Sequence, residues 1–534
     1  MEYPVETFTP AEAARLAPHV TSLDSPVFGL VNLPETVKGA LFARYSRYQG
    51  TLRRLFLDEF AGSLPDAGGA AFDGAEGERA AQLYERIFVG YGDDSVAQLG
   101  GAHIACEWVS NVLTKVLQRP RLGAYLEQST RYIPYDTPIP GGGYRYYRDA
   151  SLGPAYETAM NEVFDIYAAA LPRVRTWAEG QFARAEGESE AAHARACQAK
   201  ALDLLRGLLP AASLSHMGIF ATGQTYEQLV LHLLAHPLPE ARHYGRMILD
   251  TLQQVMPSFV SRVERPDRGG EWISFLEERE AAGRRWAARL GLDREPGEEP
   301  DGGPSVRLLH VDGDEDALLA ALLFESAGAP EEVTRTRLAA LSGDERRELL
   351  GDLLGGERRN RRHRPGRGLE ALRYRFEIVS DYGAFRDLQR HRMLTVQWQR
   401  LGPHLGAGVP DELEAAGVAG EYRRALDVSH AEWDRLVAEG RDGEALYALC
   451  LGYRIRFVLD LNAREAMQLI ELRSGREGHP SYRAVAHEMH RRIEEVHPAV
   501  AGAMTYVDRD TEPRLERILS EMRTQAKLDA LGAR

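Results

Sequence analysis

LQRHR at Leu388–Arg392 and LQRPR at Leu117–Arg121 are two copies of one frame in a chain of 534 residues. The later copy continues as MLTVQWQRL through residue 401, and the earlier copy as LGAYLEQSTRY through residue 132. An internal repeat changes the whole architecture that a sequence predicts, so it is considered first. The later copy keeps Arg-His-Arg without a polar tail, whereas the earlier copy has proline for histidine but keeps Glu-x-Ser-x-Arg-Tyr. We therefore expect two related halves that have diverged in complementary ways.

A stretch dense in acidic residues, proline and glycine, residues 291–305, separates the two frames. Such a composition has nothing to bury and is typical of a linker. We expect a first half at 1–290 and a second half at 306–534, each of ordinary domain size. The segments 225–246 and 462–483 align without a gap, which favours a tandem duplication. A shifted alignment, which places Thr222 and Gln224 at the positions of Asn462 and Arg464, is the alternative.

Hydrophobic spacing predicts mostly helices. They are expected at 156–171, 192–209, 226–234, 314–326, 421–439 and 454–472. Strands are expected at 306–311, which ends at Asp312-Gly313, and at 374–379, where apolar and charged residues alternate. Alternating strand–helix units are missing, so the pattern indicates an α+β fold rather than a doubly wound sheet.

Composition restricts the class of protein. The net charge is −14, which disfavours a general binder of nucleic acid or anionic membranes. The three cysteines form no CxxC pair, and no apolar stretch approaches the length of a membrane span. The N-terminal stretch is acidic and lacks the apolar core of a signal peptide. We expect a soluble, cytoplasmic protein.

Common nucleotide and metal motifs are missing. No GxGxxG follows a strand, no P-loop is present, and His487-Glu488-Met489-His490 is one residue too short for HExxH. No metal site is therefore expected. Six arginines between Arg358 and Arg367 are typical of an RNA-binding patch or of a mobile solvated loop, and the acidic chain favours the loop.

Two groups of polar residues suggest a ligand site. The guanidinium groups of the Arg390-His391-Arg392 frame suit phosphate and also stack on aromatic rings. Downstream, Arg464 and Gln468 share one helix face, and Arg473 returns to the side of Asn462 after three turns. Taken singly, Asn462 could be only a helix cap and each arginine a surface ion pair.

Together these groups resemble the flavin-dependent thymidylate synthase family. The Arg-His-Arg frame with its Glu-x-Ser-x-Arg-Tyr tail is similar to the first signature of that family, and Asn-x-Arg…Leu-Arg at 462–473 to a second. Residues 92–96 (GDDSV), and in the second half 370–371 and 376–378, resemble a third family stretch. The resemblance spans roughly 85–250 and 305–500. It implies two tandem copies of a domain in which helices cover a small, mostly antiparallel sheet.

The resemblance also implies a reaction. The family methylates dUMP with methylenetetrahydrofolate, using reduced FAD as the hydride source and NADPH as the reductant. It uses no cysteine nucleophile and binds FAD without a GxGxxG motif. Its sites form between subunits of a tetramer, so a duplicated chain is expected to form a homodimer that mimics that tetramer. No membrane or nucleic-acid partner is implied.

Carried onto this chain, the family roles divide between the two halves. By resemblance, the second half supplies the residues for the flavin and the cation beside the uracil: Arg390, His391, Arg392, Asn462, Arg464, Gln468 and Arg473. The first half supplies the residues for the nucleotide: Glu127, Ser129, Arg131 and Arg206. The reciprocal residues are lost, since Pro120 replaces the histidine while Trp398, Arg400, Gly402 and Leu446 replace the nucleotide set. We expect one hybrid site of unlike halves and one dead site.

Several positions depart from the family pattern. Leu99 and Ala371 stand where a histidine is expected, Thr395 replaces a serine, and Gln397 and Gln468 replace asparagines. A catalytically degenerate FAD- or nucleotide-binding homologue with a structural or regulatory role is therefore the alternative function. An RNA-associated protein that uses the loop at 358–367 is a third.

Overall fold

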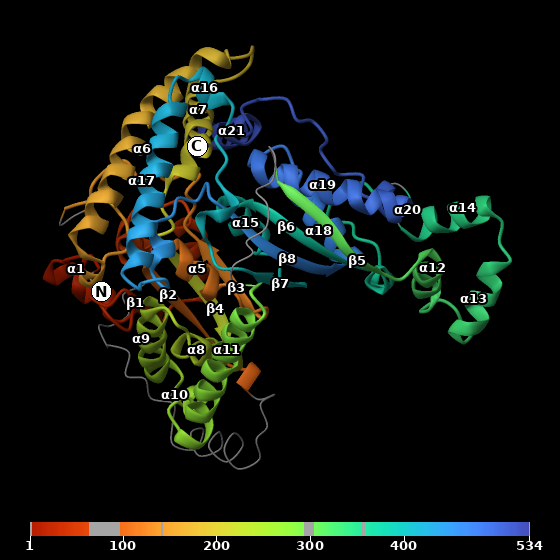
Figure 1. Ribbon diagram of the computed structural model, residues 1–534, viewed down its shortest axis with the longest axis horizontal. Coiled ribbons are helices and arrows are strands. Elements are labelled where there is room, and N and C mark those ends of the chain that lie inside the picture. Colours follow the sequence, from red (N-terminus) through yellow and green to blue (C-terminus); the bar gives the residue numbers. More distant parts are fainter. Residues whose placement is uncertain are drawn as a thin grey trace. The chain divides into compact units, whose positions relative to one another are not determined.

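The computed structural model describes residues 3–63, 97–139, 142–292, 304–354, 356 and 358–532. The GDDSV stretch at 92–96 and most of the expected linker lie outside these residues. The described chain is mainly helical and contains two four-stranded antiparallel sheets. The α+β class is therefore confirmed (Figure 1).

The two sheets repeat one topology. The first is built from β1 (Val27–Leu30), β2 (Gly101–Ser110), β3 (Gly123–Glu127) and β4 (Leu214–Thr222), in the order β1-β2-β4-β3. The second is built from β5 (Ser305–Asp312), β6 (Arg373–Asp381), β7 (Leu394–Trp398) and β8 (Arg454–Asn462), in the order β5-β6-β8-β7. The same strand order, with a short helix after β2 and after β6, confirms the tandem duplication.

Two compact units are present, and each takes segments from both halves of the sequence. Unit 1 contains residues 1–169, 208–296 and 421–450, and unit 2 contains 170–207, 297–420 and 451–534. The stretch at 291–305 therefore separates the two repeats along the sequence. As a boundary between domains it stays a prediction. Because 170–207 belongs to unit 2, residues of the first half contribute to the unit that holds the Arg-His-Arg frame.

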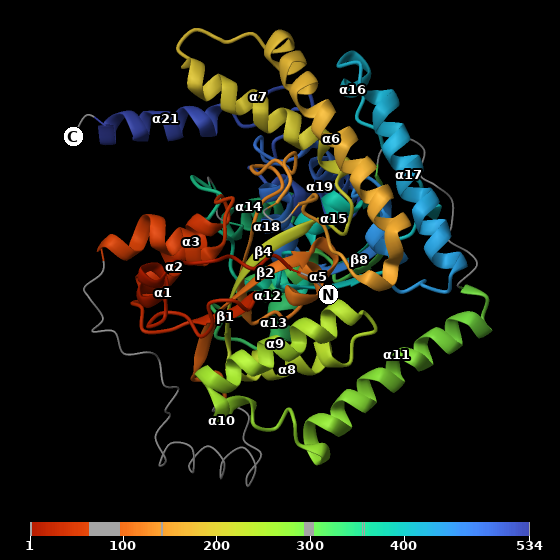
Figure 2. The same ribbon diagram turned by 90° about the vertical axis from the view of Figure 1, so that its left-hand side faces the viewer.

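Unit 1 packs helices against the first sheet, and α9 contacts β1 and β2 while α8 runs beside α9 (Figure 2). Its helices are α1 (Pro10–Leu16), α2 (Glu35–Tyr45), α3 (Leu52–Leu55), α5 (Asn111–Leu117), the first part of α6 (Gly153–Gln181), α8 (Gly223–Leu234), α9 (Pro239–Val255), α10 (Pro257–Val260), α11 (Glu271–Arg289) and most of α17 (Ala419–Ala438). Short 3-10 or π-helical turns lie at 56–60, 61–63, 150–152, 266–270 and 445–448.

Unit 2 repeats this arrangement, with α19 against β5 and β6 and α18 against β8. Its helices are the rest of α6, α7 (Glu190–Leu205), α12 (Glu315–Leu323), α13 (Glu331–Ala339), α14 (Gly343–Leu353), α15 (Tyr382–Leu388), α16 (Glu412–Ala415), α18 (Ala463–Arg473), α19 (Pro480–Val496), α20 (Pro498–Gly502) and α21 (Ile518–Gly532). Short 3-10 turns lie at 367–371 and 403–405, and another at 206–208 spans the division between the units.

The helix predicted at 454–472 is wrong for its first nine residues, which form β8. Ile455, Phe457, Leu459 and Leu461 are buried and alternate with less buried residues, which is the period of a strand. The gapless alignment of 225–246 with 462–483 is also wrong by three residues. Thr222 and Asn462 each cap the helix that follows a strand, so Thr222 is the counterpart of Asn462.

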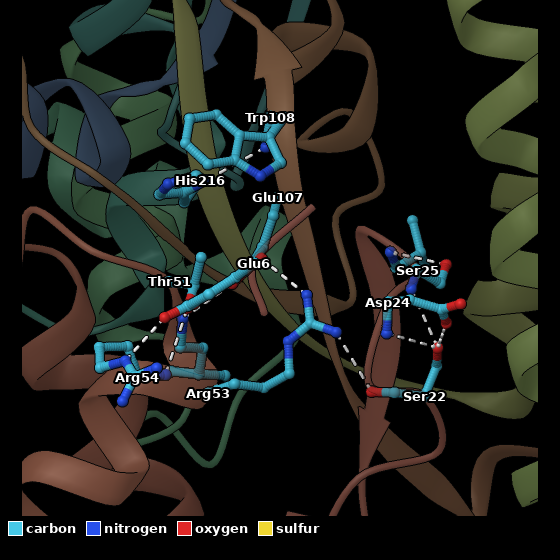
Figure 3. Close-up of polar contacts among 12 residues, drawn as sticks. Glu6, Ser22, Asp24, Ser25, Thr51, Arg53, Arg54, Glu107, Trp108 and His216 are labelled. Carbon is cyan, nitrogen blue, oxygen red and sulfur yellow. Dashed lines mark hydrogen bonds and ion pairs between the residues drawn. The ribbon is translucent and has the colours of Figure 1, made fainter. Parts of the chain in front are cut away.

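A buried carboxylate organises one side of unit 1 (Figure 3). Glu107 lies at a bulge of β2, where the pairing with β4 shifts between Cys106 and Val109. Its Oε1 accepts hydrogen bonds from Leu52 N (2.7 Å) and from the hydroxyl of Tyr45 (3.0 Å). Its Oε2 lies 3.2 Å from Arg53 Nη2, which completes an ion pair with both side chains buried. Burial raises the pKa of Glu107, and Arg53 opposes that shift.

We predict that Glu107→Gln destabilises the protein by about 3 kcal/mol, because it leaves the buried Arg53 charge without a partner. Chemical denaturation followed by circular dichroism measures the loss. Glu264→Gln is the matched control, because its pair with Arg246 is exposed and such pairs contribute about 0–1 kcal/mol. Equal effects of the two substitutions would contradict this account.

Candidate functional site

The Arg-His-Arg frame follows α15 in unit 2, where His391 is the central residue. His391 is only 7% exposed, and its Nδ1 lies 2.9 Å from Glu465 Oε1 on α18. Its Nε2 lies 3.1 Å from Nε of Arg473, at the end of the same helix. The arginine Nε–H can only donate, so Nε2 of His391 accepts this hydrogen bond. Nδ1 of His391 therefore carries the ring proton and donates a hydrogen bond to Glu465. One histidine therefore connects the two groups of residues that the sequence predicted to act together.

An arginine from the first half of the sequence lies beside this frame. Arg206 follows α7 and is 3% exposed, and its Nη1 lies 3.1 Å from Asp387 Oδ2 on α15. The other carboxylate oxygen of Asp387 lies 3.6 Å from Arg390 Nη1. Asp387 thus holds an arginine of each half, and all three residues belong to unit 2.

The position of Arg206 depends on a glycine in the first turn of α15. A Cβ atom on Gly383 would lie 3.0 Å from both Nε and Nη2 of Arg206, too close for comfortable packing. In unit 1, Val112 of the first half takes the position of Gly383, and Leu446 of the second half takes that of Arg206. The unit without the arginine therefore also lacks the glycine that makes room for it.

Helix α7 is fixed within unit 2 by charged contacts of its own. Lys200 Nζ lies 2.9 Å from Glu516 Oε1 and 3.3 Å from Glu412 Oε1, with the lysine buried. Arg195 Nε lies 2.8 Å from Glu521 Oε2 on α21, and Figure 2 shows α7 and α21 in the same region of the unit. These contacts hold the segment that ends at Arg206.

The remaining second-half residues lie on or next to α18. Asn462 caps the helix, since its Oδ1 accepts from Glu465 N at 2.9 Å. Arg464 Nε donates to the carbonyl oxygen of Pro365 at 3.3 Å, and its Nη1 lies 3.8 Å from Glu370 Oε1. Gln468 is partly exposed one turn later, and Arg392 is exposed after His391.

The nucleotide set of the first half, apart from Arg206, lies in unit 1. Glu127 is buried, and its Oε2 lies 2.8 Å from both Lys115 Nζ and Gln118 Nε2. The Ser129 hydroxyl accepts from Arg131 N at 3.3 Å, which closes a tight turn, and Arg131 is buried. The structure therefore brings Arg206 together with the second-half residues in one unit, while Glu127, Ser129 and Arg131 belong to the other.

The first-half counterparts of the frame cannot form the same contacts. Pro120 replaces His391, Thr225 replaces Glu465, and the buried Leu233 replaces Arg473 in the corrected register. Helix α10 also covers the N-terminal end of α8. A Cβ atom on Gly223, the first residue of α8, would lie 2.6 Å from the ring of Phe259 on α10. The chemistry of the frame survives in one copy only.

The sequence did not single out Asp387, Glu465 or Gly383. The signal for these three residues is a contrast between the two copies, because the first copy has Val116, Thr225 and Val112 at the same positions. The three-residue error in the alignment of α8 with α18 hid the Glu465 contrast.

Acidification is predicted to break the bond between His391 and Arg473. Burial lowers the pKa of His391, Arg473 and Arg364 lower it too, and the bond to Glu465 opposes them. A pKa below the unfolded value of about 6.5 means that the unfolded chain takes up the proton first. Stability is therefore complete above pH 6.5 and falls as the pH drops through that value toward the lower folded pKa.

The melting temperature of wild type and of His391→Gln, measured between about pH 5 and pH 8, tests this prediction. The wild type should lose its advantage over the variant toward the acid end. An advantage that does not change with pH would contradict a neutral His391.

No helix in the part of the chain that the structure describes is both long and apolar enough to cross a membrane. The same described residues contain no cluster of His, Cys, Asp and Glu that could hold a metal ion.

Comparison with known proteins places this geometry in a family. Residues 60–258 and 310–499 each match the model of the thymidylate synthase complementing protein family. A UPF0159 protein of Chlamydia muridarum is 36% identical, over 97% of this chain and 99% of its own. Another UPF0159 protein, of Thermoplasma acidophilum, is 30% identical over 92% of this chain and 99% of its own.

A solved structure, the UMP/dUMP methylase PolB of Streptomyces cacaoi bound with 5-Br dUMP, is also similar. It aligns with a TM-score of 0.32 at 20% identity, over 40% of this chain and all of its own. The two family-model matches together cover well over half of the chain. The chain therefore belongs to the thymidylate synthase complementing protein family, which it matches once in each half.

Proposed function

We propose that this protein is a flavin-dependent thymidylate synthase that methylates dUMP with methylenetetrahydrofolate, with FAD as cofactor and NADPH as reductant. The observation that carries the proposal is the cluster of Arg206, Asp387 and Arg390. In this cluster an arginine of the first half that the resemblance assigns to the nucleotide lies beside the second-half Arg-His-Arg frame that it assigns to the flavin. Such a mixture is what a hybrid site requires.

The residues present fit anionic ligands. Arg206 Nη2 is buried and lies 3.9 Å from Asp381 Oδ1, but among the described residues it forms no hydrogen bond, so a donor remains for a phosphate. The partly exposed Arg390, with Arg464, Asn462 and Gln468, supplies the fixed cations and amides that suit the phosphates and ring edges of FAD. When bound, reduced FAD would supply the hydride that completes the methyl group.

Arg473 is assigned to the uracil ring. Burial lowers its pKa while Asp387 opposes that shift, so a cation is held in a partly buried place. A fixed cation there stabilises the N3-deprotonated form of uracil, which is the more nucleophilic form of the ring. His391 engages only Nε of the guanidinium and thereby fixes its plane.

Arg206, Ser129 and Arg131 are assigned to the phosphate of dUMP, with Glu127 positioning the segment that carries them. Glu127 performs that role through Lys115 and Gln118, whose buried bonds hold the end of β3 to α5. We infer that two chains combine to present unit 1 residues and unit 2 residues to one nucleotide. The dead reciprocal set leaves one live site for each chain.

The first test of this function is the visible absorbance of the purified protein with and without dUMP. We predict a flavin spectrum that shifts on addition of dUMP, and a dUMP affinity about 10–100-fold lower in Arg473→Ala and in Arg131→Ala. Arg119→Ala is the matched control, because it removes the frame arginine of the dead copy. A protein that takes up no FAD would contradict the proposed enzyme activity. Flavin bands that do not change on addition of dUMP would favour the catalytically degenerate homologue.

The second test addresses the space around Arg206. Gly383→Ala is predicted to displace the guanidinium and weaken dUMP binding about tenfold, without changing FAD uptake. Gly351→Ala on α14 is the control, because a Cβ atom there meets nothing within 4 Å. Titration of dUMP followed by flavin absorbance measures both, and wild-type affinity in Gly383→Ala would refute the role of Arg206.

A further inference from the structure

Helix α11 runs along the outside of unit 1 and presents a row of exposed apolar residues (Figure 2). Leu276 is its one buried residue, and the helix contacts α8 and the π-helical turn at 266–270. Four large apolar residues of the helix and its C-cap are 44–64% exposed: Trp272, Phe275, Trp286 and Leu290. At 3.6 residues per turn they fall on one side, with Arg279 and Gly283 between them. Such a row marks an interaction surface.

The helix lies outside the parts of the chain that match the family. The first match ends at residue 258 and the second begins at residue 310, whereas α11 runs from Glu271 to Arg289. The exposed row is therefore an addition to the family domain. The charges of the helix indicate which partner fits it.

Acidic residues occupy the first half of α11 and basic residues the second half. Glu271 and Glu278 flank the exposed row in the first half. Arg285 and Arg289 flank it on the same side in the second half. Within the described chain none of these four residues forms an ion pair, so their charges remain available to a partner.

We propose that the exposed row of α11 binds the same row of a second copy of this chain, with the two helices antiparallel. In a twofold-symmetric pair, residue i contacts residue j while residue j contacts residue i. With the twofold axis level with Ala281, Trp272 lies opposite Leu290 of the second copy. Phe275 likewise lies opposite Trp286 of the second copy. Each large apolar residue of the row is then covered.

The same register accounts for a glycine within the helix. A Cβ atom on Gly283 would meet nothing within 4 Å, so packing inside the chain does not require a glycine there. Glycine in a helix interior costs about 1 kcal/mol relative to alanine. In the pair, Gly283 lies opposite Arg279 of the second copy, where the missing side chain leaves room for a long one.

Charge complementarity selects the antiparallel orientation. With the axis at the same level, Glu278 lies next to Arg285 of the second copy. Glu271 lies next to Arg289 of the second copy, and symmetry repeats both pairs. A parallel arrangement would place glutamate beside glutamate and arginine beside arginine, which is repulsive.

The charge balance of α11 argues against a membrane surface, the alternative partner of an amphipathic helix. Helices that lie in a membrane interface are rich in Lys and Arg on the polar face and are attracted to anionic lipids. In α11 the glutamates are as many as the arginines, and the whole chain has a net charge of −14. Membrane binding is therefore an outcome of the test rather than the proposal.

Analytical ultracentrifugation of the full-length protein over a concentration series tests the pairing. Two helices that touch over about 27 Å form a small interface, so the mass should double reversibly in the micromolar range. Phe275→Glu/Trp286→Glu should weaken the doubling at least about tenfold, because it places like charges in the contact. The control, Phe324→Glu/Val333→Glu, changes the charge equally at exposed apolar residues of unit 2 and should keep the doubling.

A wild type whose mass does not change up to about 100 µM would overturn the proposal. So would a doubling that Phe275→Glu/Trp286→Glu retains. Co-sedimentation of the wild type with phosphatidylserine vesicles, lost in this variant and without self-association, would assign the row to a membrane instead. The pair does not depend on the proposed function: a wild type that doubles its mass but binds no dUMP would reject that function and leave the pair in place.

Exchanged charges test whether the partner is the same helix. Glu271→Arg/Glu278→Arg and Arg285→Glu/Arg289→Glu should each lose the doubling, because like charges then meet across the pair. An equimolar mixture of the two variants should regain it. A mixture that stays unpaired would contradict the pairing of α11 with itself.

Cysteine cross-linking tests the orientation. The native cysteines are buried, so only introduced thiols should react under mild oxidation. Chains with Trp272→Cys should cross-link to chains with Leu290→Cys, and neither variant should cross-link when alone. Cross-linking of each variant with itself would show a parallel pair and overturn the proposed arrangement.

Discussion

The candidate site depends on the two ion pairs that Asp387 forms with arginines. One carboxylate lies between Arg206, which the first half of the sequence supplies, and Arg390 of the second-half frame. Without it, the buried Arg206 would keep only the longer contact of its Nη2 with Asp381 Oδ1, at 3.9 Å, and would face the like charge of the exposed Arg390. Because Arg206 ends a helix that belongs to unit 2, the pair also explains why the exchange of segments between the halves matters for chemistry.

The same contact clarifies the asymmetry of the duplication. The second half keeps His391, Glu465 and Arg473 as a bonded series, and the first half keeps Arg206 and the turn at Ser129. Each half has lost what the other retains, down to the glycine that accommodates Arg206. Loss without constraint would remove residues from both sets, so the pattern favours one maintained ligand site.

Much of this was predictable from residue patterns. The repeated frame predicted the duplication, and the missing alternation of strands and helices predicted the α+β class. The strand at 454–462 was missed because its alternating apolar residues run directly into the helix 463–473, and together they imitate a single long helix. The contacts of Asp387 and Gly383 with Arg206 could not be predicted, because folding brings residue 206 next to residues 383–387 from a distant part of the sequence.

The number of nucleotides bound by each chain tests the central claim most directly. Equilibrium dialysis of dUMP against the FAD-loaded protein should give one nucleotide for each chain of 534 residues, because only one of the two frames keeps its histidine and its late arginine. Two nucleotides for each chain would show that the proline-containing copy is also a site. No binding at saturating dUMP would remove the basis for a hybrid site altogether.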